Sequence, residues 1–304
     1  MKALDVKNLS KKYGDFTAVD GISFEAEAGS LLGFLGVNGA GKSTTINMLS
    51  TLLSPTGGQV EVCGYRLGKE DMEIRNSIGI VYQSNVLDDL LTVKENLVIR
   101  AGAAGLGNAE IRSRLADLTT LLKLEPILSK RYRLLSGGQK RRCEIALALM
   151  HSPKILFLDE PTTGLDPATR IDVWDTIKAL RASEDMTVFL TTHYMEEAAS
   201  ADKIIIIDHG KKLAEGTPFT LKEKYAKDKL KLYFDRENES AITELLKNED
   251  MTSTPYGAKV SLSGSLKAYD ILSKVREKIG GFEVIQGNMD DVFLNVTGMS
   301  KEVI

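Results

Sequence analysis

The chain has 304 residues and a formal net charge of −3; 43% of its residues are hydrophobic and 27% are charged. These values are ordinary for a soluble globular protein and exclude intrinsic disorder and a fibrous repeat. The length suits one large and one small domain. The slightly acidic balance argues against a general nucleic-acid binder, although it does not exclude a local basic patch.

The cysteine content and the apolar runs indicate the cellular compartment in which the protein works. The two cysteines, Cys63 and Cys143, are too few for a disulfide framework and favour a reducing cytosol. Residues 1–15 alternate and carry charges, where a secretory leader needs a continuous apolar core. The aliphatic runs at 154–159 and 203–208 are too short to cross a bilayer and are typical of buried strands. If the protein serves a membrane process, we expect another polypeptide to span the membrane.

The N-terminal part has the apolar patterns of strands, either alternating or continuous. Strands are predicted at 4–10, 22–28, 30–36, 58–65 and 77–83. A helix is expected at 42–53, shortly after the third of these strands. From about residue 92 to 150 the pattern becomes helical. Thr92 and Glu95 match a capping box there, and one face of a second helix carries Ile111, Leu115, Leu118 and Leu122.

Strands return after this helical stretch, at 154–160, 187–193 and 203–208, with a helix at 167–182 between the first two. Parallel strands joined by helices suit this alternation, so an α/β fold is predicted. Residues 208–211 predict a hairpin turn. Residues 216–225 predict a capped helix with Pro218 in its first turn.

The last part of the chain predicts a different order of elements: strand, helix, strand, strand, helix, strand. That order is the split βαβ plan of ferredoxin-like domains. We therefore expect two domains, at 1–225 and 229–304, the second a small α+β domain. The helical subdomain of the first is expected at about 85–150.

The segment "GVNGAGKST", residues 36–44, places three glycines, a lysine and two hydroxyl residues directly after an apolar run. Glycines at this density indicate a backbone that bends sharply or approaches something closely. A helix beginning there directs unpaired N–H groups and its dipole toward an anion. Lys42 adds a positive charge, and Ser43 can offer its hydroxyl to Mg²⁺ between two phosphates, which completes the G-x-x-x-x-G-K-[ST] pattern. A nucleoside triphosphate is favoured over the alternative, a glycine-rich turn with a solvated lysine.

Two adjacent carboxylates, Asp159 and Glu160, end the buried strand "ILFLDE". Because successive strand residues face opposite ways, different roles are expected for them. Asp159 is placed to hold a magnesium shell, and Glu160 to polarise an attacking water. Without the phosphate loop, solvated acids at a strand end would be the preferred interpretation.

The segment "LSGGQKRR", residues 135–142, again sets a hydroxyl and two glycines before a helix. Ser136 is expected to be the N-cap of that helix, with neighbouring N–H groups directed at an anion. Alone, the pattern is only a favourable helix start. Lys140, Arg141 and Arg142 are expected to form a solvated helix face.

Together these segments resemble the ATP-binding subunit of an ABC transporter, over residues 1 to about 220. Residues 36–44 match the Walker A motif, and residues 135–139 match the family signature. The other motifs follow the family's order: Gln83 for the Q-loop, 155–160 for Walker B and its glutamate, 164–167 for the D-loop and His193 for the switch histidine. The resemblance implies an ABC ATPase domain with a mixed-sheet core and a helical subdomain.

The resemblance also implies roles for single residues, with ATP and Mg²⁺ as cofactors. Catalytic roles fall to Glu160, His193 and Lys42. The implied metal contacts are Ser43, Gln83 and Asp159. The implied ATP contacts are Tyr13, which would stack on adenine, and Gly36, Asn38, Gly39, Ala40, Gly41, Lys42, Ser43 and Thr44.

In such proteins two ATPase subunits form a head-to-tail dimer that encloses ATP. The resemblance therefore implies that the signature of one subunit closes on the ATP of the other through Ser136, Gly137, Gly138 and Gln139. Asp166 is implied in communication across the dimer, although it could simply cap the following helix. Tyr13 could likewise only pack on a strand. A lone histidine is more often structural, but His193 follows a strand at the end where open α/β sheets bind ligands.

Residues 84–97 and 288–298 are similar to exporters of the drug-resistance and sodium-efflux type. This similarity implies a second copy or a homologous ATPase subunit as one partner and a separate polytopic permease as the other. No nucleic acid is expected, and the location implied is the cytoplasmic face of the cell membrane, peripherally bound. A soluble ABC ATPase acting on ribosomes or DNA is the alternative, but those proteins typically have two modules or a long coiled coil. An unrelated kinase or GTPase does not explain "LSGGQ".

The segment "MDDVFLNVTG" predicts a short helix with one apolar stripe, formed by Met289, Val292, Phe293 and Val296. Two interpretations stay open. The stripe either closes the core of the small domain or docks across the dimer.

Overall fold

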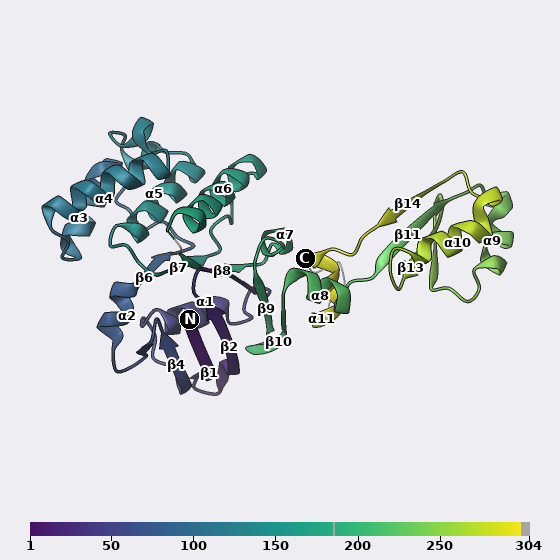
Figure 1. The fold of residues 1–304 in the computed structure, drawn as a ribbon, viewed down its shortest axis with the longest axis horizontal. Coiled ribbons are helices and arrows are strands. Elements are labelled where there is room, and N and C mark those ends of the chain that lie inside the picture. Colours follow the sequence, from purple (N-terminus) through teal and green to yellow (C-terminus); the bar gives the residue numbers. More distant parts are fainter. Residues whose placement is uncertain (185, 299–304) are drawn as a thin grey trace. The chain divides into compact units, whose positions relative to one another are not determined.

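The structure is a computed structural model that describes residues 1–184 and 186–298. The chain divides into two compact units, Met1–Glu215 and Gly216–Ile304 (Figure 1). The division falls earlier than the boundary at 225–229 expected from the sequence. Helix α8 (Pro218–Tyr225) groups with the second unit because it packs against α11 (Met289–Thr297).

One sheet of the first unit has four antiparallel strands in the order β2-β1-β4-β5. Its strands are β1 (Lys2–Tyr13), β2 (Phe16–Glu27), β4 (Gly57–Val62) and β5 (Tyr65–Arg66). Apolar residues alternate along β1 and β2, which fits a sheet with one face in the core and the other toward water.

The second sheet has six strands in the order β10-β9-β3-β8-β7-β6. Strands β3, β6, β7, β8 and β9 pair in parallel. The bounds are β3 (Leu31–Leu35), β6 (Ile78–Val81), β7 (Ile155–Asp159), β8 (Thr187–Thr192), β9 (Lys203–Asp208) and β10 (Lys211–Gly216). Every residue of β3, β7 and β8 is buried, which explains their continuous apolar runs. The predicted mixed-sheet α/β core is confirmed.

The main core lies between these two sheets. Phe24 of β2 packs against Phe34 of β3 with ring centroids 5.5 Å apart, and Phe34 packs against Phe189 of β8 at 5.2 Å. Helix α1 (Lys42–Leu49) contributes Ile46 and Met48 to the same cluster. The phosphate-loop helix is thereby fixed by the core that holds the strand before it.

The predicted helical subdomain comprises α3 (Val93–Ala103), α4 (Asn108–Leu121) and α5 (Gly137–Leu149), with single turns at Glu125–Ile127 and Tyr132–Leu134 between α4 and α5. Thr92 and Glu95 form the expected capping box at the start of α3. The four apolar residues expected on one face of α4 are all buried. Helix α6 (Pro167–Glu184) then connects β7 to β8.

Three helices differ from the prediction. α1 was expected to reach residue 53 but ends at Leu49, because Thr51 has a left-handed φ of 65° and the amides of Leu52 and Leu53 both donate to the Asn47 carbonyl. The short helices α2 (Asp71–Ser77) and α7 (Met195–Ala198) were not predicted. Both are too short for a clear apolar periodicity.

The second unit contains β11 (Asp228–Tyr233), α9 (Glu239–Leu245), β12 (Met251–Thr254), β13 (Gly257–Leu262), α10 (Lys267–Val275) and β14 (Gly281–Ile285). Single turns lie at Arg236–Asn238 and Arg276–Lys278. The sheet is antiparallel in the order β12-β13-β11-β14, so β13 lies between the two strands that α9 connects. This is the split βαβ order expected from the sequence.

Three of the four residues of the apolar stripe of α11 are buried within a single chain, and the fourth, Val296, is partly buried. Met289, Val292 and Phe293 are at most 3% exposed, and α11 contacts α8. The Asn295 side-chain amide donates to the Tyr225 carbonyl at 2.7 Å, at the end of α8. This burial within one chain argues against docking across a dimer, but no described residue of α11 belongs to the hydrophobic cluster under the β11–β14 sheet, so the stripe packs with α8 and does not close that core. None of the described helices is long and apolar enough to cross a membrane.

Candidate active site

The phosphate loop turns tightly between β3 and α1, at positions where only glycine fits easily. Gly39 and Gly41 have φ angles of 84° and 106°. A Cβ on Gly41 would lie 2.6 Å from the Ala18 carbonyl oxygen. The turn between β9 and β10 supports the loop, because the Gly210 amide donates to the Ala40 carbonyl at 3.1 Å. The expected sharp bend is found, and the close approach at Gly41 is to the Ala18 carbonyl; the approach of an anion stays a prediction.

Helix α1 starts without a side-chain cap, since its N-cap residue is Gly41. The first-turn amides of such a helix favour an anionic partner. Lys42 lies at the same place, and its ammonium group donates to the carbonyls of Gly36 at 2.8 Å and Val37 at 3.1 Å. The loop thus concentrates one full positive charge and several amide dipoles in a few residues. Asn38, Gly39 and Ser43 are exposed around it.

The two carboxylates at the end of β7 have different partners, as expected. The Asp159 Oδ1 atom accepts hydrogen bonds from the hydroxyls of Thr191 at 2.6 Å and Ser43 at 3.3 Å. Glu160 leaves the strand with a left-handed φ of 47°, and its amide donates to the carbonyl and the hydroxyl of Thr191, both at 3.1 Å. A non-glycine residue in this region of φ is uncommon and is a frequent feature of functional sites.

The Glu160 carboxylate is where the predicted catalytic residues meet. Its Oε1 atom lies 3.0 Å from Lys42 Nζ. Its Oε2 atom lies 3.3 Å from His193 Nδ1 and accepts hydrogen bonds from Gln83 Nε2 at 3.4 Å and the Thr163 hydroxyl at 3.1 Å. The structure therefore brings Lys42, Gln83, Glu160 and His193 together. Thr163 belongs to the same group and was missed by the sequence analysis.

Burial raises the pKa of the Glu160 carboxyl, but the hydrogen bond and charge of Lys42, helped by His193 and Thr163, outweigh it. The net pKa lies below the ordinary value, so Glu160 is a carboxylate at neutral pH. A carboxylate is the form that can accept a proton from water.

A buried acid, Glu197, holds the loop that carries His193. It accepts hydrogen bonds from the hydroxyls of Thr162 and Thr192, the second at 2.6 Å. The Thr192 hydroxyl in turn accepts from the Tyr194 amide at 2.9 Å. His193 Nδ1 is within ion-pair distance of Glu160 but makes no hydrogen bond to a described residue. Glu197 was not singled out in the sequence, where nothing distinguishes it from the adjacent Glu196.

The signature segment forms the predicted helix start. The Ser136 hydroxyl accepts from the Gln139 amide at 3.3 Å, and the Gln139 side-chain oxygen accepts from the Ser136 amide at 3.1 Å. Ser136 and Gly137 are exposed. Among the described residues, no hydrogen bond or ion pair joins residues 136–139 to residues 36–44 of the same chain.

The two signature glycines also have a packing reason that the sequence analysis missed. A Cβ on Gly137 would lie 2.8 Å from Leu165 Cδ2, and one on Gly138 would lie 2.4 Å from Thr169 Cγ2. Asp166 caps α6, because its carboxylate accepts from the Thr169 amide at 3.1 Å and hydroxyl at 2.5 Å. The simple alternative considered for Asp166 is thus present, and a role across a dimer stays a prediction.

Two further expectations concern single side chains. The ring of Tyr13 is not packed away, since the residue is 48% exposed with Lys11 Nζ 5.2 Å from the ring centroid. The solvated helix face expected for the basic run after the signature is wrong for Arg141, which is buried. Arg141 pairs with Glu144 at 3.1 Å, three residues further along α5, and this buried acid satisfies the charge.

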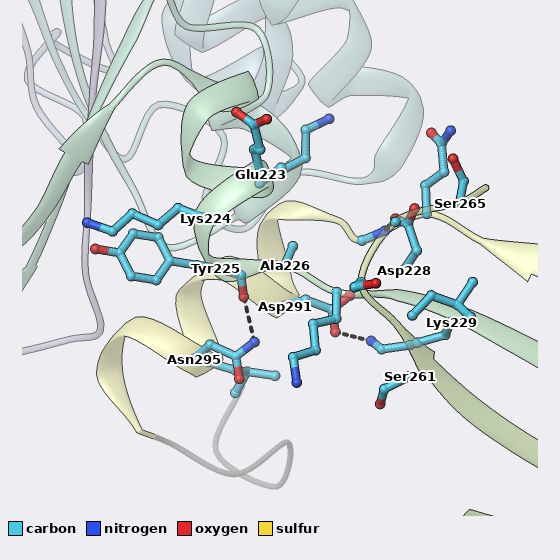
Figure 2. A pocket seen from close by; sticks show the side chains of 18 of the residues that line it. Glu223, Lys224, Tyr225, Ala226, Asp228, Lys229, Ser261, Ser265, Asp291 and Asn295 are labelled. Atoms are coloured by element: carbon cyan, nitrogen blue, oxygen red, sulfur yellow. Dashed lines mark hydrogen bonds and ion pairs between the residues drawn. The ribbon is translucent and has the colours of Figure 1, made fainter. Parts of the chain in front are cut away.

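A separate cavity of about 1090 Å³ lies within the second unit, lined by residues of α8, β11, β13 and α11 (Figure 2). Five lysines line it, together with Glu223, Asp228 and Asp291. Lys229 forms an ion pair with Asp291, and the Gly287 amide donates to Asp228 at 2.9 Å. None of the residues predicted to contact ATP lines this cavity.

Comparisons with known proteins agree with the site. The family model described as ABC transporter matches residues 19–163, a range that includes Lys42, Gln83, the signature and Glu160. The daunorubicin/doxorubicin resistance ATP-binding protein DrrA of Streptomyces peucetius is 38% identical over 98% of this chain and 93% of its own length. The Nod factor export ATP-binding protein I of Rhizobium sp. (strain N33) is 36% identical over 99% of this chain and 98% of its own length.

A solved structure extends the agreement to the fold. The ATP-binding cassette MJ0796, in a dimeric post-hydrolysis state bound to ADP and Pi, has a TM-score of 0.63 and 29% identity. The match covers 70% of this chain and 98% of that one. With the phosphate loop, the signature and the buried Glu160 cluster, these similarities show that the chain belongs to the ATP-binding subunits of ABC transporters and is an ATPase of that family.

Proposed function

We propose that this chain is the ATPase of an exporter, that it works as a head-to-tail dimer, and that a separate membrane permease carries the cargo. The observation that carries the ATPase part of the proposal is the meeting of Lys42, Gln83 and His193 on the Glu160 carboxylate, directly beside the phosphate loop. A buried carboxylate with these partners is suited to activating water for attack on a phosphate.

The role proposed for each residue follows from its contacts. Lys42 and the loop amides bind the phosphates, and Glu160 orients and deprotonates the attacking water. His193 and Gln83, both in contact with Glu160 Oε2, position this carboxylate and the group bound next to it. The exposed ring of Tyr13 stacks on adenine. Asn38, Ala40 and Thr44 complete the ATP contacts.

The residues beside the loop also fit Mg²⁺. Ser43 Oγ and Asp159 Oδ1 lie 3.3 Å apart, so two hard oxygen ligands are already adjacent. We propose that these two atoms and Gln83 hold the ion, which would neutralise phosphate charge when bound. Thr191 orients Asp159 for this role through its 2.6 Å hydrogen bond.

The signature supports the dimer. Ser136 and Gly137 are exposed at the start of α5 and have no bond to the phosphate loop of their own chain. A helix start formed by exposed residues is suited to closing over an anion held by another subunit. Asp166 lies at the start of α6, against which the signature glycines pack, and is proposed to sense that closure.

The exporter assignment is supported by the names of two relatives, a drug-resistance and a Nod-factor-export ATP-binding protein. Such a subunit would bind peripherally at the cytoplasmic face of the membrane. Its permease partner would be polytopic, and its ATPase partner would be a second copy or a homologue.

Affinity purification of the tagged chain from detergent-solubilised membranes tests the assignment. A polytopic membrane protein should co-purify with the wild-type chain and should stimulate its ATPase activity after reconstitution. Recovery of ribosomes or DNA without a membrane protein would instead support the rival, a soluble ABC ATPase.

A further inference from the structure

Helix α5 carries two buried charged residues for which the proposed chemistry has no use. Arg141 is 6% exposed and Glu144 is 3% exposed, and Arg141 Nη1 lies 3.1 Å from Glu144 Oε2. Placing an ion pair in a protein interior carries a desolvation cost that the attraction between the charges often only balances. A stabilising role alone therefore explains this pair poorly.

Both residues bind the main chain of the Q-loop, defined here as Tyr82–Val86. Arg141 Nη1 donates to the Tyr82 carbonyl at 2.6 Å, and Nη2 donates to the Gln83 carbonyl at 3.4 Å. At the other end of the loop, Glu144 Oε1 accepts from the Val86 amide at 3.1 Å. The pair thus holds the Q-loop at both ends.

The helical subdomain fixes the pair in turn. Tyr132, which is fully buried, donates its hydroxyl to Glu144 Oε1 at 3.0 Å. Arg141 and Glu144 are one helical turn apart and lie on the same side of α5. Ser136 of the signature lies five residues before Arg141, so a rise of about 7.5 Å along one helix separates Ser136 from the Q-loop anchor.

Gln83 connects the Arg141–Glu144 pair to the Glu160 carboxylate. Its main-chain carbonyl is bound by Arg141, and its side-chain amide donates to Glu160 Oε2 at 3.4 Å. A displacement of α5 would therefore move the main chain of Gln83 and change the approach of its amide to Glu160. Errors of about 1 Å near a reaction centre can lower the rate by about 100-fold.

We propose that Arg141 and Glu144 are positioning residues that fix the Q-loop to the signature helix, so that Gln83 and the signature move as one body when the ATP site closes. This proposal rests on the proposed function, because it assigns regulation to the same ATP site. Neither residue touches ATP; both act through Gln83.

The test replaces the pair without leaving a buried charge. Arg141→Met/Glu144→Leu removes both charges, and uncharged replacements of a buried pair are often tolerated. We expect ATP binding by the isolated chain to stay within about twofold and kcat to fall by about 10-fold to 100-fold. The matched control is Arg142→Met on the same helix, whose guanidinium donates to Leu122 at 3.4 Å and has no described bond to the Q-loop.

A double-mutant cycle with Gln83→Ala separates positioning from a general loss of structure. If the pair acts through Gln83, adding Arg141→Met/Glu144→Leu to Gln83→Ala should lower kcat little further. Independent, multiplicative losses would overturn the proposal, as would a lowered melting temperature with unchanged kcat. Arg141→Lys keeps the positive charge but cannot donate to both carbonyls as the guanidinium does. It should therefore recover part of the kcat that Arg141→Met/Glu144→Leu loses. A wild-type chain without ATPase activity would refute the proposed function, whereas failure of the cycle alone would refute only this inference.

Discussion

Lys42 Nζ lies 3.0 Å from Glu160 Oε1, and both side chains are buried, with 4% and 8% of their surface exposed. In this arrangement the cation proposed to bind phosphate instead neutralises the carboxylate proposed to activate water. Transfer of Lys42 to a phosphate would remove the main influence that lowers the pKa of Glu160, and the carboxylate would become a stronger base. Substrate binding and activation of the base are thus connected through one ammonium group.

Replacing Glu160 by Gln should preserve MgATP binding and abolish most hydrolysis. The amide keeps the shape of the side chain but cannot accept a proton from water. Loss of a general base typically lowers kcat by about 10²–10⁴-fold. Single-turnover kinetics with a parallel nucleotide titration checks both parts, with Glu61→Gln, an exposed residue of β4, as the control. Wild-type turnover in Glu160→Gln would exclude this residue as the base.

Lys42→Ala should differ by weakening ATP binding itself, since it removes a charge from the phosphate loop. It should also destabilise the nucleotide-free chain, because Glu160 is left buried without its cation; for an unpaired buried group the cost is on the order of 1–3 kcal/mol. Adding Glu160→Gln to Lys42→Ala should recover this stability but not the ATP affinity. Urea unfolding and nucleotide titration measure the two effects, with Lys69→Ala as an exposed control. Unchanged ATP affinity in Lys42→Ala would count against the phosphate loop.

The lowered pKa of Glu160 predicts how stability depends on pH. The folded pKa lies below the ordinary value of 4.5. The contribution of the pair is therefore fully present above pH 4.5 and is lost as the pH falls through the folded pKa. The free energy of unfolding of the wild-type chain should thus fall more steeply in this acid range than that of Glu160→Gln. Parallel curves for the two proteins would show that the ion pair is not formed in solution.

Helix α11 is predicted to stabilise the second unit. Phe293 is 1% exposed, and Phe→Ala in a core typically costs about 3–5 kcal/mol, so Phe293→Ala should destabilise the second unit. Truncation after Gly287 should do the same. ATP affinity of the first unit and dimerisation should stay near normal in both variants, which sedimentation and nucleotide titration can check. Lost dimerisation with a stable second unit would revive the docking interpretation, and lost ATP binding by a folded monomer would contradict both.

The local signals in the sequence were sufficient for most of the strands, the phosphate loop and the signature helix start, although β5 was missed and β2 begins at Phe16, six residues before the predicted start. Continuous apolar runs identified β3, β7 and β8, and glycine spacing identified the loop, because both are properties of adjacent residues. The early end of α1 was not predictable, since it depends on the left-handed conformation of Thr51.

Arg141 shows what local signals miss. Because Lys140 and Arg142 flank it, Arg141 was predicted to lie on a solvated helix face. The carbonyls that it binds, however, belong to residues 59 and 58 positions away in the sequence. The packing of Gly138 against Thr169 has the same origin, since the two residues belong to different helices. Contacts between distant elements decided both cases, and no periodicity in a single element encodes them.

Mixed dimers of Lys42→Ala and Ser136→Arg chains test the shared ATP site most directly. In a head-to-tail heterodimer one site carries both defects, while the other combines an intact phosphate loop with an intact signature. Each variant alone should be inactive, and mixing them should restore part of the ATPase activity or ATP-driven closure. No recovery beyond the sum of the two separate variants would contradict a site built from two subunits.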